Sequence, residues 1–237
     1  MKKLRALIQA GGNGARLTPS TTVLPQALMP IGDGTVISRQ LTQLSAAGVD
    51  HVVVTLQHHG ELISSYCGDG SRWNVTLEYL QEDVPLGTIG ALDSLADRLD
   101  SSFLVLNSDV YTEIDLRSVV ASHNASECAL TIVTTSQEVY IAYGVLEHAD
   151  GRLIDFIEKP REQLAVSAGI YCMSREVLGY IPTNQPFGFD ELVTAMLDAG
   201  EPISTYHHDA AWIDIGRIED LRSAEDTAVR SLGTTTI

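Results

Sequence analysis

Three closely spaced glycines, Gly11, Gly12 and Gly14, follow a short apolar run near the start of the chain, and an arginine, Arg16, comes two residues later. Glycine has no Cβ, so a glycine turn can bring backbone N–H groups close to an anion. The guanidinium of Arg16 adds a planar donor that stays charged and can bind two phosphate oxygens at once. The spacing therefore predicts a phosphate-binding loop after a first strand.

Three prolines, Pro19, Pro25 and Pro30, follow this loop. In a dinucleotide-binding turn a helix begins directly at the glycines, and prolines at these positions disfavour such a helix. We expect instead a long, irregular loop that wraps around its ligand. An NAD-dependent oxidoreductase would need a helix at Gly14 and an acidic residue after the second strand, so the prolines count against this alternative.

Two further side chains follow predicted strands. Asp109 lies in Leu106-Asn-Ser-Asp-Val-Tyr-Thr112, where a carboxylate can hold a hard cation such as Mg²⁺ against phosphate oxygens. A turn-capping aspartate is the alternative at this position. Lys159 precedes Pro160, so we expect an extended backbone that projects the lysine from the end of a strand. A solvated Glu-Lys turn is the alternative there.

The composition is that of a globular protein. The 237 residues, 44% of them hydrophobic, are enough to bury one large core. The formal net charge of -16 would repel a nucleic-acid backbone, so we expect no nucleic-acid partner. No apolar stretch is long enough to cross a membrane, and no cleavable apolar segment precedes the glycine loop. We therefore expect a cytoplasmic protein with no membrane partner.

Cysteines and histidines carry no metal or disulfide pattern. Cys67, Cys128 and Cys172 are odd in number and far apart, which fits reduced, mostly buried thiols. Four of the seven histidines form two adjacent pairs, at 58–59 and 207–208, and neighbours in a strand point to opposite faces. We expect these histidines to be surface or packing residues.

Alternating strands and helices must hold the candidate residues. Short apolar or β-branched runs predict strands over 4–8, 51–56, 75–80, 103–107, 128–134, 144–147, 153–157 and 168–173. Apolar residues at helical spacing predict helices over 36–47, 61–66, 88–99 and 189–197. This order implies an α/β protein with a mostly parallel sheet, covered on both faces, whose ligands bind at the carboxyl ends of the strands.

The glycine and proline segments resemble the signature of the sugar-1-phosphate nucleotidyltransferases, or sugar-nucleotide pyrophosphorylases. That signature is roughly G-G-x-G-x-R-L-x-P-x-T, followed by P-K-x-L-x-P-I, and this chain has Gln26 in place of the lysine. The resemblance runs from Leu4 to about Ala224. It implies a Rossmann-like three-layer αβα fold of the nucleotide-diphospho-sugar transferase type, with a mostly parallel mixed central sheet.

The resemblance also implies the domain organisation and the cofactor. We expect a single nucleotidyltransferase domain over residues 1–237, with a nucleotide half over about 1–125 and a sugar-phosphate half over about 126–232, packed on one sheet. Mg²⁺ is the implied cofactor. Its implied ligands are Asp109 and Asp214, the second of which lies in the W-x-D-x-G segment that runs from Trp212 to Gly216.

The sugar phosphate is implied to bind in the second half. In the family's E-K-P motif the lysine, here Lys159, binds the sugar phosphate, and Glu158 contacts sugar hydroxyls. Gly144 and Gly169 match glycines that let the sugar approach the backbone. Ser167 stands two residues before Gly169, in a segment where the family commonly has an asparagine.

The nucleotide base is expected near Glu82 to Thr88, a stretch that is most similar to the guanylyltransferases for mannose or heptose 1-phosphate. Guanine offers adjacent N1–H and N2–H donors that the Glu82 carboxylate can accept as a pair, whereas uracil or thymine offers one donor between acceptors. We expect GTP, with UTP, dTTP, CTP or ATP as alternatives. The expected nucleotide-binding residues are Gln9, Ala10, Gly11, Gly12, Asn13, Gly14, Arg16, Glu82, Pro85, Gly87, Thr88 and Asp109.

The implied activity is transfer of a nucleotidyl group from a nucleoside triphosphate to a sugar 1-phosphate, with release of pyrophosphate. No protein nucleophile is needed, because positioning and charge neutralisation carry the reaction. The expected catalytic residues are Arg16, Gln26, Asp109 and Lys159. A nucleotide-sugar-binding regulatory subunit without turnover, suggested by Gln26, is the alternative from another class. The sequence leaves the oligomeric state open, with a homo-oligomer among the options.

Overall fold

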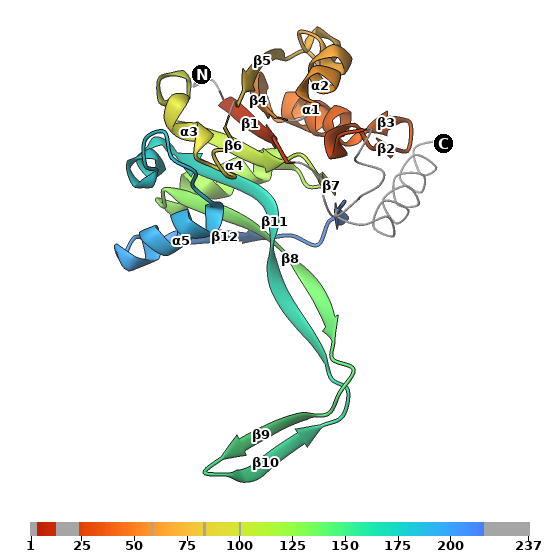
Figure 1. Ribbon diagram of the computed structural model, residues 1–237, viewed down its shortest axis with the longest axis vertical. Helices are drawn as coiled ribbons and strands as arrows, with labels where there is room; N and C mark the ends of the chain where they lie inside the picture. The colour runs from red at the N-terminus through yellow and green to blue at the C-terminus, as the bar shows by residue number, and fades with distance from the viewer. Residues whose placement is uncertain (1–3, 13–23, 58, 83, 100, 216–237) are drawn as a thin grey trace.

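The computed structural model describes residues 4–12, 24–57, 59–82, 84–99 and 101–215 (Figure 1). The strands are β1 Leu4–Ala10, β2 Pro30–Ile31, β3 Gly34–Thr35, β4 Val49–Leu56, β5 Thr76–Gln81, β6 Ser102–Asn107, β7 Val110–Thr112, β8 Leu130–Tyr140, β9 Val145–Ala149, β10 Arg152–Ile157, β11 Arg161–Ser174, β12 Ile203–His207 and β13 Trp212–Asp214. The α-helices are α1 Val36–Ala46, α2 Gly60–Cys67, α3 Ala91–Ser94, α4 Leu116–Ser126 and α5 Phe189–Asp198. The 3₁₀ segments are η3 Gln26–Leu28, η4 Ser71–Trp73, η5 Ala96–Arg98 and η6 Arg175–Tyr180.

A seven-stranded sheet forms the body, in the order β12-β8-β11-β6-β1-β4-β5. The strand β11 is antiparallel to both of its neighbours, and the other pairs are parallel. Helices cover both faces of the sheet (Figure 1). The predicted α/β class, with a mostly parallel mixed sheet, is confirmed.

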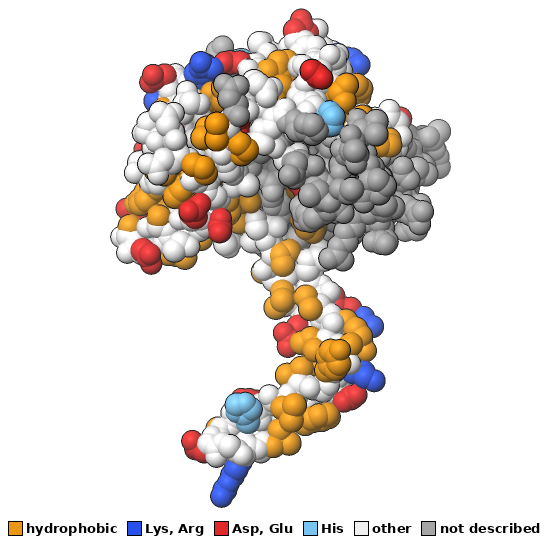
Figure 2. Space-filling model, viewed as in Figure 1, with side chains coloured by type: hydrophobic (Ala, Val, Ile, Leu, Met, Phe, Trp, Pro, Cys, Tyr) orange, Lys and Arg blue, Asp and Glu red, His pale blue; other side chains and the backbone are white. Residues whose placement is uncertain are grey.

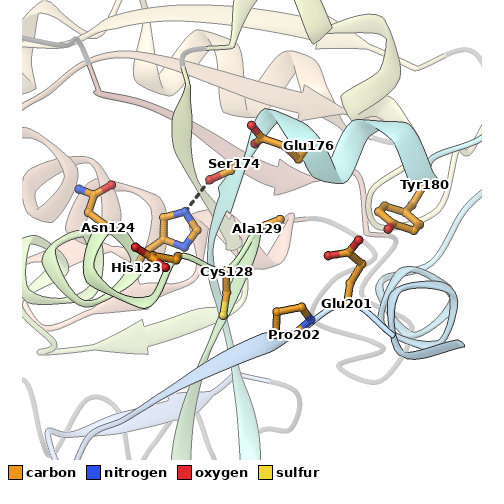
Figure 3. A pocket seen from close by; sticks show the side chains of 10 residues that line it. His123, Asn124, Cys128, Ala129, Ser174, Glu176, Tyr180, Glu201 and Pro202 are labelled. Carbon is orange, nitrogen blue, oxygen red and sulfur yellow. Dashed lines mark hydrogen bonds between the residues drawn. The ribbon is translucent and has the colours of Figure 1, made fainter. Parts of the chain in front are cut away.

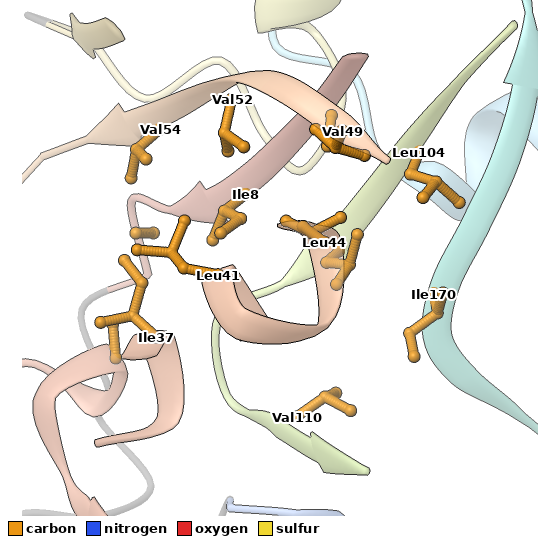
Figure 4. Close-up of a cluster of buried hydrophobic side chains, with 14 of the residues drawn as sticks. Ile8, Ile37, Leu41, Leu44, Val49, Val52, Val54, Leu104, Val110 and Ile170 are labelled. Carbon is orange, nitrogen blue, oxygen red and sulfur yellow. The ribbon is translucent and has the colours of Figure 1, made fainter. Parts of the chain in front are cut away.

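Local sequence explains the first β-α-β unit. Thr35 begins α1 with a capping box: its hydroxyl accepts from the Ser38 N–H at 3.3 Å, and the Ser38 hydroxyl accepts from the Thr35 N–H at 2.8 Å. The helix ends before Gly48, whose φ of 86° suits glycine. Leu41 and Leu44 of this helix are fully buried against β1, β4 and β6 (Figure 4). Burial of each such leucine stabilises the fold by roughly 1.5–3 kcal/mol.

A second apolar cluster, defined by Ile89, Leu92, Leu95, Phe103 and Met196, covers the other face of the sheet. The predicted helix over 88–99 is wrong in its continuity, because α3 and η5 divide it. Its apolar spacing is correct, since Ile89, Leu92 and Leu95 are all fully buried. Gly90 precedes α3, and an added Cβ there would lie 2.7 Å from the Gln185 carbonyl oxygen. The start of α3 therefore packs closely against the segment that contains Gln185.

The second half differs most from the expected arrangement. The strands β8 and β11 are much longer than predicted, and their outer parts leave the sheet as a two-stranded ribbon that carries the β9–β10 hairpin (Figure 1). We call residues 136–166 the arm. Its residues are exposed with few exceptions, so this part of the sugar-phosphate half does not pack on the sheet as expected.

Two further findings concern membrane spans and disulfides among the described residues. No helix in them is long and apolar enough to span a membrane. Cys67, Cys128 and Cys172 are free thiols, and burial raises the pKa of both Cys67 and Cys172 to about 12. These two thiols are protonated packing groups.

Candidate active site

Two short strands bring the candidate metal ligands together. In the antiparallel pair of β7 and β13, Asp214 lies opposite Val110, the residue after Asp109. The next residue, Ile215, donates its backbone N–H to the Asp109 carbonyl oxygen at 2.8 Å. Both aspartates are half-buried. Two carboxylates that are 105 positions apart in the sequence (214 − 109) therefore lie on neighbouring backbone segments.

Hydrogen bonds from α1 and to β1 hold the turn that carries Asp109. Gln40 of α1 donates its side-chain N–H groups to the carbonyl oxygens of Asn107 at 2.7 Å and Val110 at 3.0 Å. Ser108 donates its backbone N–H to the Gln9 carbonyl oxygen at 3.2 Å. These bonds tie the Asp109 turn to the end of β1, where the glycine loop begins.

Gln26 also reaches this site. Its side chain is buried, with 8% exposed, and Nε2 donates to the Ile215 carbonyl oxygen at 3.0 Å. Its Oε1 lies 3.9 Å from the position that a Cβ on Gly12 would take. The residue that stands in place of the family lysine therefore lies between the glycine loop and the strand that carries Asp214.

The described part of the glycine loop fits a close backbone approach. A Cβ on Gly11 would lie 2.9 Å from the Gln57 side-chain nitrogen, so the backbone at Gly11 packs closely against that amide. Ala10 is buried, and its side chain packs in the core, so only its backbone faces the loop. The predicted residues Asn13, Gly14 and Arg16 lie outside the described residues.

The predicted base-reading residue Glu82 is buried, with 9% exposed, and it is not a solvated surface glutamate. Its Oε2 accepts from Gln57 Nε2 at 2.8 Å and from the Leu86 backbone N–H at 3.2 Å. The carboxylate is thereby held in one orientation at the carboxyl end of β5. Gln57, which links it to Gly11, was not among the predicted site residues, although a polar residue directly after β4 was a usable signal.

The rest of the predicted base loop is clamped to the start of α5. Thr88 accepts the Phe189 backbone N–H on its hydroxyl at 2.8 Å, and its carbonyl accepts from the Gln9 side chain. Gly87 has φ of 74°, and a Cβ there would lie 2.6 Å from the Phe187 carbonyl oxygen. Pro85 is exposed. The loop therefore connects the end of β1 with α5.

Ser167 and Gly169 lie beside the Asp109 turn, at the irregular register of β11 between Ser167 and Tyr171. A Cβ on Gly169 would lie 2.9 Å from Asn107 Nδ2. The Ser167 hydroxyl donates to the Tyr171 hydroxyl at 3.3 Å. Burial, and to a lesser degree the negative charge of Asp109, raise the pKa of Tyr171, which is therefore a protonated neighbour of the site.

Two residues near this irregularity were missed from the sequence. Tyr171 lies within an apolar run and gives no local signal. Trp212, seen only as part of a motif, donates Nε1–H to the Ala168 carbonyl oxygen at 2.8 Å and so fixes β13 to β11.

The other predicted sugar-phosphate residues are not at this site. Gly144, Glu158 and Lys159 lie together on the arm, where Lys159 Nζ is 3.6 Å from Glu158 Oε1. The ring of Phe156 fills the space that a Cβ on Gly144 would need, at 2.5 Å. The expected extended backbone at Lys159 is wrong: its φ is 48°, because the chain turns there from β10 into β11.

A separate cavity of about 470 Å³ lies at the opposite edge of the sheet, at the amino ends of β8 and β12 (Figure 3). His123 at its wall is buried, and its ring nitrogens bond the hydroxyls of Thr131 at 2.9 Å and Ser174 at 3.0 Å. Glu127, Glu176 and Glu201 are among the other residues that line it. None of the predicted site residues lines this cavity.

The geometry defines a class: an α/β protein whose glycine turn and paired carboxylates meet at the carboxyl ends of parallel strands, as in proteins that bind nucleotide phosphates. Among the described residues no group of three or more His, Cys, Asp or Glu side chains could hold a metal on its own. Residues 5–231 match the family described as nucleotidyl transferase, and the chain belongs to that family.

Similar proteins differ in the nucleotide named for them. A UTP–glucose-1-phosphate uridylyltransferase from Synechocystis is 32% identical, over 92% of this chain and 61% of its own length. A mannose-1-phosphate guanyltransferase from Yarrowia lipolytica is 31% identical, over 97% of this chain and 65% of its length. This chain thus spans less than two thirds of either relative.

A solved structure confirms the fold. The putative glucose-1-phosphate thymidylyltransferase from Bacillus anthracis superimposes with a TM-score of 0.77 at 22% identity, over 95% of each chain. The nucleotide-diphospho-sugar transferase type of fold, expected from the sequence motifs, is therefore correct.

Proposed function

We propose that this protein transfers a nucleotidyl group from a nucleoside triphosphate to a sugar 1-phosphate. A sugar-phosphate oxygen forms a bond to the α-phosphorus, the bond from that phosphorus to the β-phosphate oxygen breaks, and pyrophosphate leaves. The observation that carries the proposal is the convergence of Gly11, Gly12, Gln26, Asp109 and Asp214 in a chain of the nucleotidyl transferase family. No side chain has to act as a nucleophile.

Mg²⁺ is the cofactor that fits the donor set. Two carboxylates on neighbouring strands suit a cation that keeps several waters and takes its other ligands from substrate phosphates. Bound there, it would neutralise charge on the phosphates. Asp109 and Asp214 would hold it. The backbone bond from Ile215 and the side-chain bonds from Gln40 would keep the separation of the two aspartates fixed.

The remaining residues would bind and orient the substrates. Backbone N–H groups at Gly11 and Gly12, together with Arg16, would bind the leaving pyrophosphate. Ser167 and Gly169, the second of which packs beside Asn107 and Val110, would face the sugar next to Asp109. Lys159, whose ammonium would bind the acceptor phosphate, has to reach this edge from the arm.

GTP is the nucleotide we favour. The Glu82 carboxylate is pre-oriented by Gln57 and the Leu86 N–H, and the guanine edge offers two adjacent donors to such a group. The similar proteins include one named for UTP and one named for a guanylyl transfer, so family membership alone does not select the base.

The three free thiols support a reducing compartment, and we propose the cytoplasm. A second candidate function, a regulatory subunit that binds nucleotide sugar without turnover, is favoured by one observation. Gln26 uses its amide in a buried hydrogen bond and brings no positive charge to the phosphates.

One experiment separates these functions. Purified protein is mixed with Mg²⁺, each nucleoside triphosphate and a panel of sugar 1-phosphates, and pyrophosphate release is measured. We expect release that requires both substrates and is fastest with GTP. Binding of a nucleotide sugar without pyrophosphate release from any pair would support the regulatory function instead.

A further inference from the structure

The arm is the most apolar exposed part of the described chain. Nine of the thirteen exposed large hydrophobic side chains lie on it: Val139, Tyr140, Tyr143, Leu146, Leu153, Ile154, Phe156, Ile157 and Leu164. Figure 2 shows hydrophobic side chains gathered along the arm, away from the body. Leu146 and Phe156 are directly paired across the β9–β10 hairpin, at 58% and 53% exposure.

The hairpin is apolar on both of its faces. Successive residues of a strand point to opposite faces, so Phe156 and Ile157 lie on different sides, and both are more than half exposed. A two-stranded hairpin is only marginally stable in water without a surface to pack against. The arm therefore has the composition of a segment that is covered on both sides.

The arm also carries the only lysine among the described residues. Lys159 is the single lysine of the chain after Lys3. The proposed acceptor phosphate needs a cation beside Asp109 and Asp214. The lysine implied for it lies between β10 and β11, just beyond the outermost β8–β11 pair, Tyr140 with Arg161. Under the proposed function, the acceptor-phosphate part of the site is therefore incomplete without the arm.

The ribbon does not favour closure within one copy. Its strands pair without interruption from Thr134 and Ser167 out to Tyr140 and Arg161. The register shift of this pair lies in the body, between Ser167 and Tyr171. To return Lys159 to its own Asp109, the ribbon would have to fold back and break ladder hydrogen bonds. A second copy can contact the arm without any change in the pairing of β8 with β11.

We propose that two copies of this chain exchange arms, so that the hairpin of each copy covers the other's active-site edge. Lys159 of one copy then faces Asp109 and Asp214 of the other, and the apolar faces of the arms are buried between the two bodies. This arrangement rests on the proposed function for the role of Lys159. A symmetric dimer closes because each copy gives and receives the same element.

The first test measures assembly and does not depend on activity. Sedimentation velocity of the full chain should show a dimer, and Leu146→Asp combined with Phe156→Asp should convert it to a monomer. Leu197→Asp is the matched control, because Leu197 on α5 is 61% exposed on the body, and it should leave the dimer intact. A monomeric parent protein, or a dimer that survives the double substitution, overturns the proposal.

The second test asks which copy supplies Lys159. Lys159→Ala and Asp109→Asn chains with different affinity tags are co-expressed, and mixed dimers are purified through both tags. Exchanged arms give each mixed dimer one intact site, so about half of the parental activity per dimer should return. Mixed dimers no more active than the two single variants would mean that each arm serves its own copy, which also overturns the proposal.

If the parent protein releases no pyrophosphate, the proposed function is refuted but arm exchange is not. A third test, which does not need activity, then decides whether the arms are exchanged. Dimers formed from ¹⁴N- and ¹⁵N-labelled chains are treated with a carbodiimide, which joins amines to carboxylates. Peptides that link Lys159 to Asp109 or Asp214 should then include mixed-isotope pairs. Same-isotope pairs alone would show closure within one copy and reject arm exchange.

Discussion

The side-chain nitrogen Nε2 of Gln26 lies 3.0 Å from the backbone carbonyl oxygen of Ile215, the residue after Asp214. Ile215 in turn donates its N–H to the Asp109 carbonyl oxygen at 2.8 Å. Gln26 therefore fastens η3 to the strand pair that carries both candidate metal ligands. The position combines a structural hydrogen bond with a missing positive charge, and substitution can separate the two.

Gln26→Lys should raise turnover by about ten-fold or more, the equivalent of roughly 1.4 kcal/mol. The lysine ammonium can still donate to Ile215, and it adds a cation where negative charge accumulates in the transition state. The measurement is the steady-state rate of pyrophosphate release at saturating substrates.

Gln26→Met is the control for this prediction. It keeps the length of the side chain but removes the donor, so the buried Ile215 carbonyl loses a hydrogen bond, at a cost of about 1–3 kcal/mol in the free energy of unfolding. The methionine variant should not gain rate. A lysine variant that is as stable as the parent but no faster would show that position 26 does not face the triphosphate.

Asp109→Asn and Asp214→Asn should each abolish most turnover while the protein remains folded. Each change removes one anionic ligand from a Mg²⁺ site with few protein ligands to spare. Rates are measured across a Mg²⁺ titration, with circular dichroism to check folding. Asp209→Asn is the control, because its side chain is 96% exposed and should not matter. Full activity at limiting Mg²⁺ in either site variant would remove that residue from the metal site.

Glu82→Gln should reduce the preference for GTP over the other triphosphates by about ten-fold or more, because an amide cannot accept both guanine donors. A hydrogen bond to a charged group contributes roughly 1.5–3 kcal/mol. The measurement compares kcat/KM for each triphosphate. Glu78→Gln, on the same strand but paired with Arg98, should leave selectivity unchanged. If Glu82→Gln only lowers thermal stability, the carboxylate braces the Leu86 loop and does not read the base.

Strands and helices with strong local patterns were predictable. The apolar run Ala6, Leu7 and Ile8 before a glycine turn indicates a parallel strand, and apolar residues at helical spacing over 36–47 predict the helix that the structure shows as α1. The edge at which Gly11 and Asp109 meet follows from the same pattern, because the carboxyl ends of parallel strands share an edge.

Other parts of the site depend on contacts between distant residues and have no local signal. The strands β7 and β13 have three residues each, and they are strands only because they pair with each other. The pattern at Lys159 shows a strand end but not that the strand leaves the sheet. Tyr171 reads as a core residue, and only the bulge of β11 places its hydroxyl beside Ser167.

The burial of His123 predicts that the folded protein loses stability in mild acid. Burial lowers its pKa below the ordinary value of 6.5, and Glu176 only partly opposes this. The unfolded chain therefore binds a proton more readily than the folded protein. The contribution of neutral His123 is complete above a pH of about 6.5 and is lost as the pH falls below it.

The measurement is the melting temperature at a pH of about 7.5 and of about 5.5. We expect a smaller decrease in His123→Gln than in the parent protein, since glutamine does not titrate. His207→Gln is the control, because the side chain of His207 is 45% exposed, and it should retain the parental decrease. Equal decreases in all three proteins would assign the acid sensitivity to other groups.

Gly169→Ala should weaken the site and the fold together, and a second glycine separates the two causes. Gly169 has φ of 70°, and an alanine Cβ would lie 2.9 Å from Asn107 Nδ2 and 3.0 Å from Val110 Cγ2, on both sides of Asp109. Gly200 has a similar φ of 76°, but an added Cβ there meets nothing within 4 Å. Gly200→Ala therefore reports the cost of the left-handed backbone alone, about 1–2 kcal/mol.

Chemical denaturation should show a larger loss of stability in Gly169→Ala than in Gly200→Ala. The kcat of Gly169→Ala should also fall, while Gly200→Ala keeps the parental rate. Equal losses of stability with unchanged kcat would mean that the Asp109 turn tolerates the added methyl group, and that the close approach of β11 does not position this carboxylate.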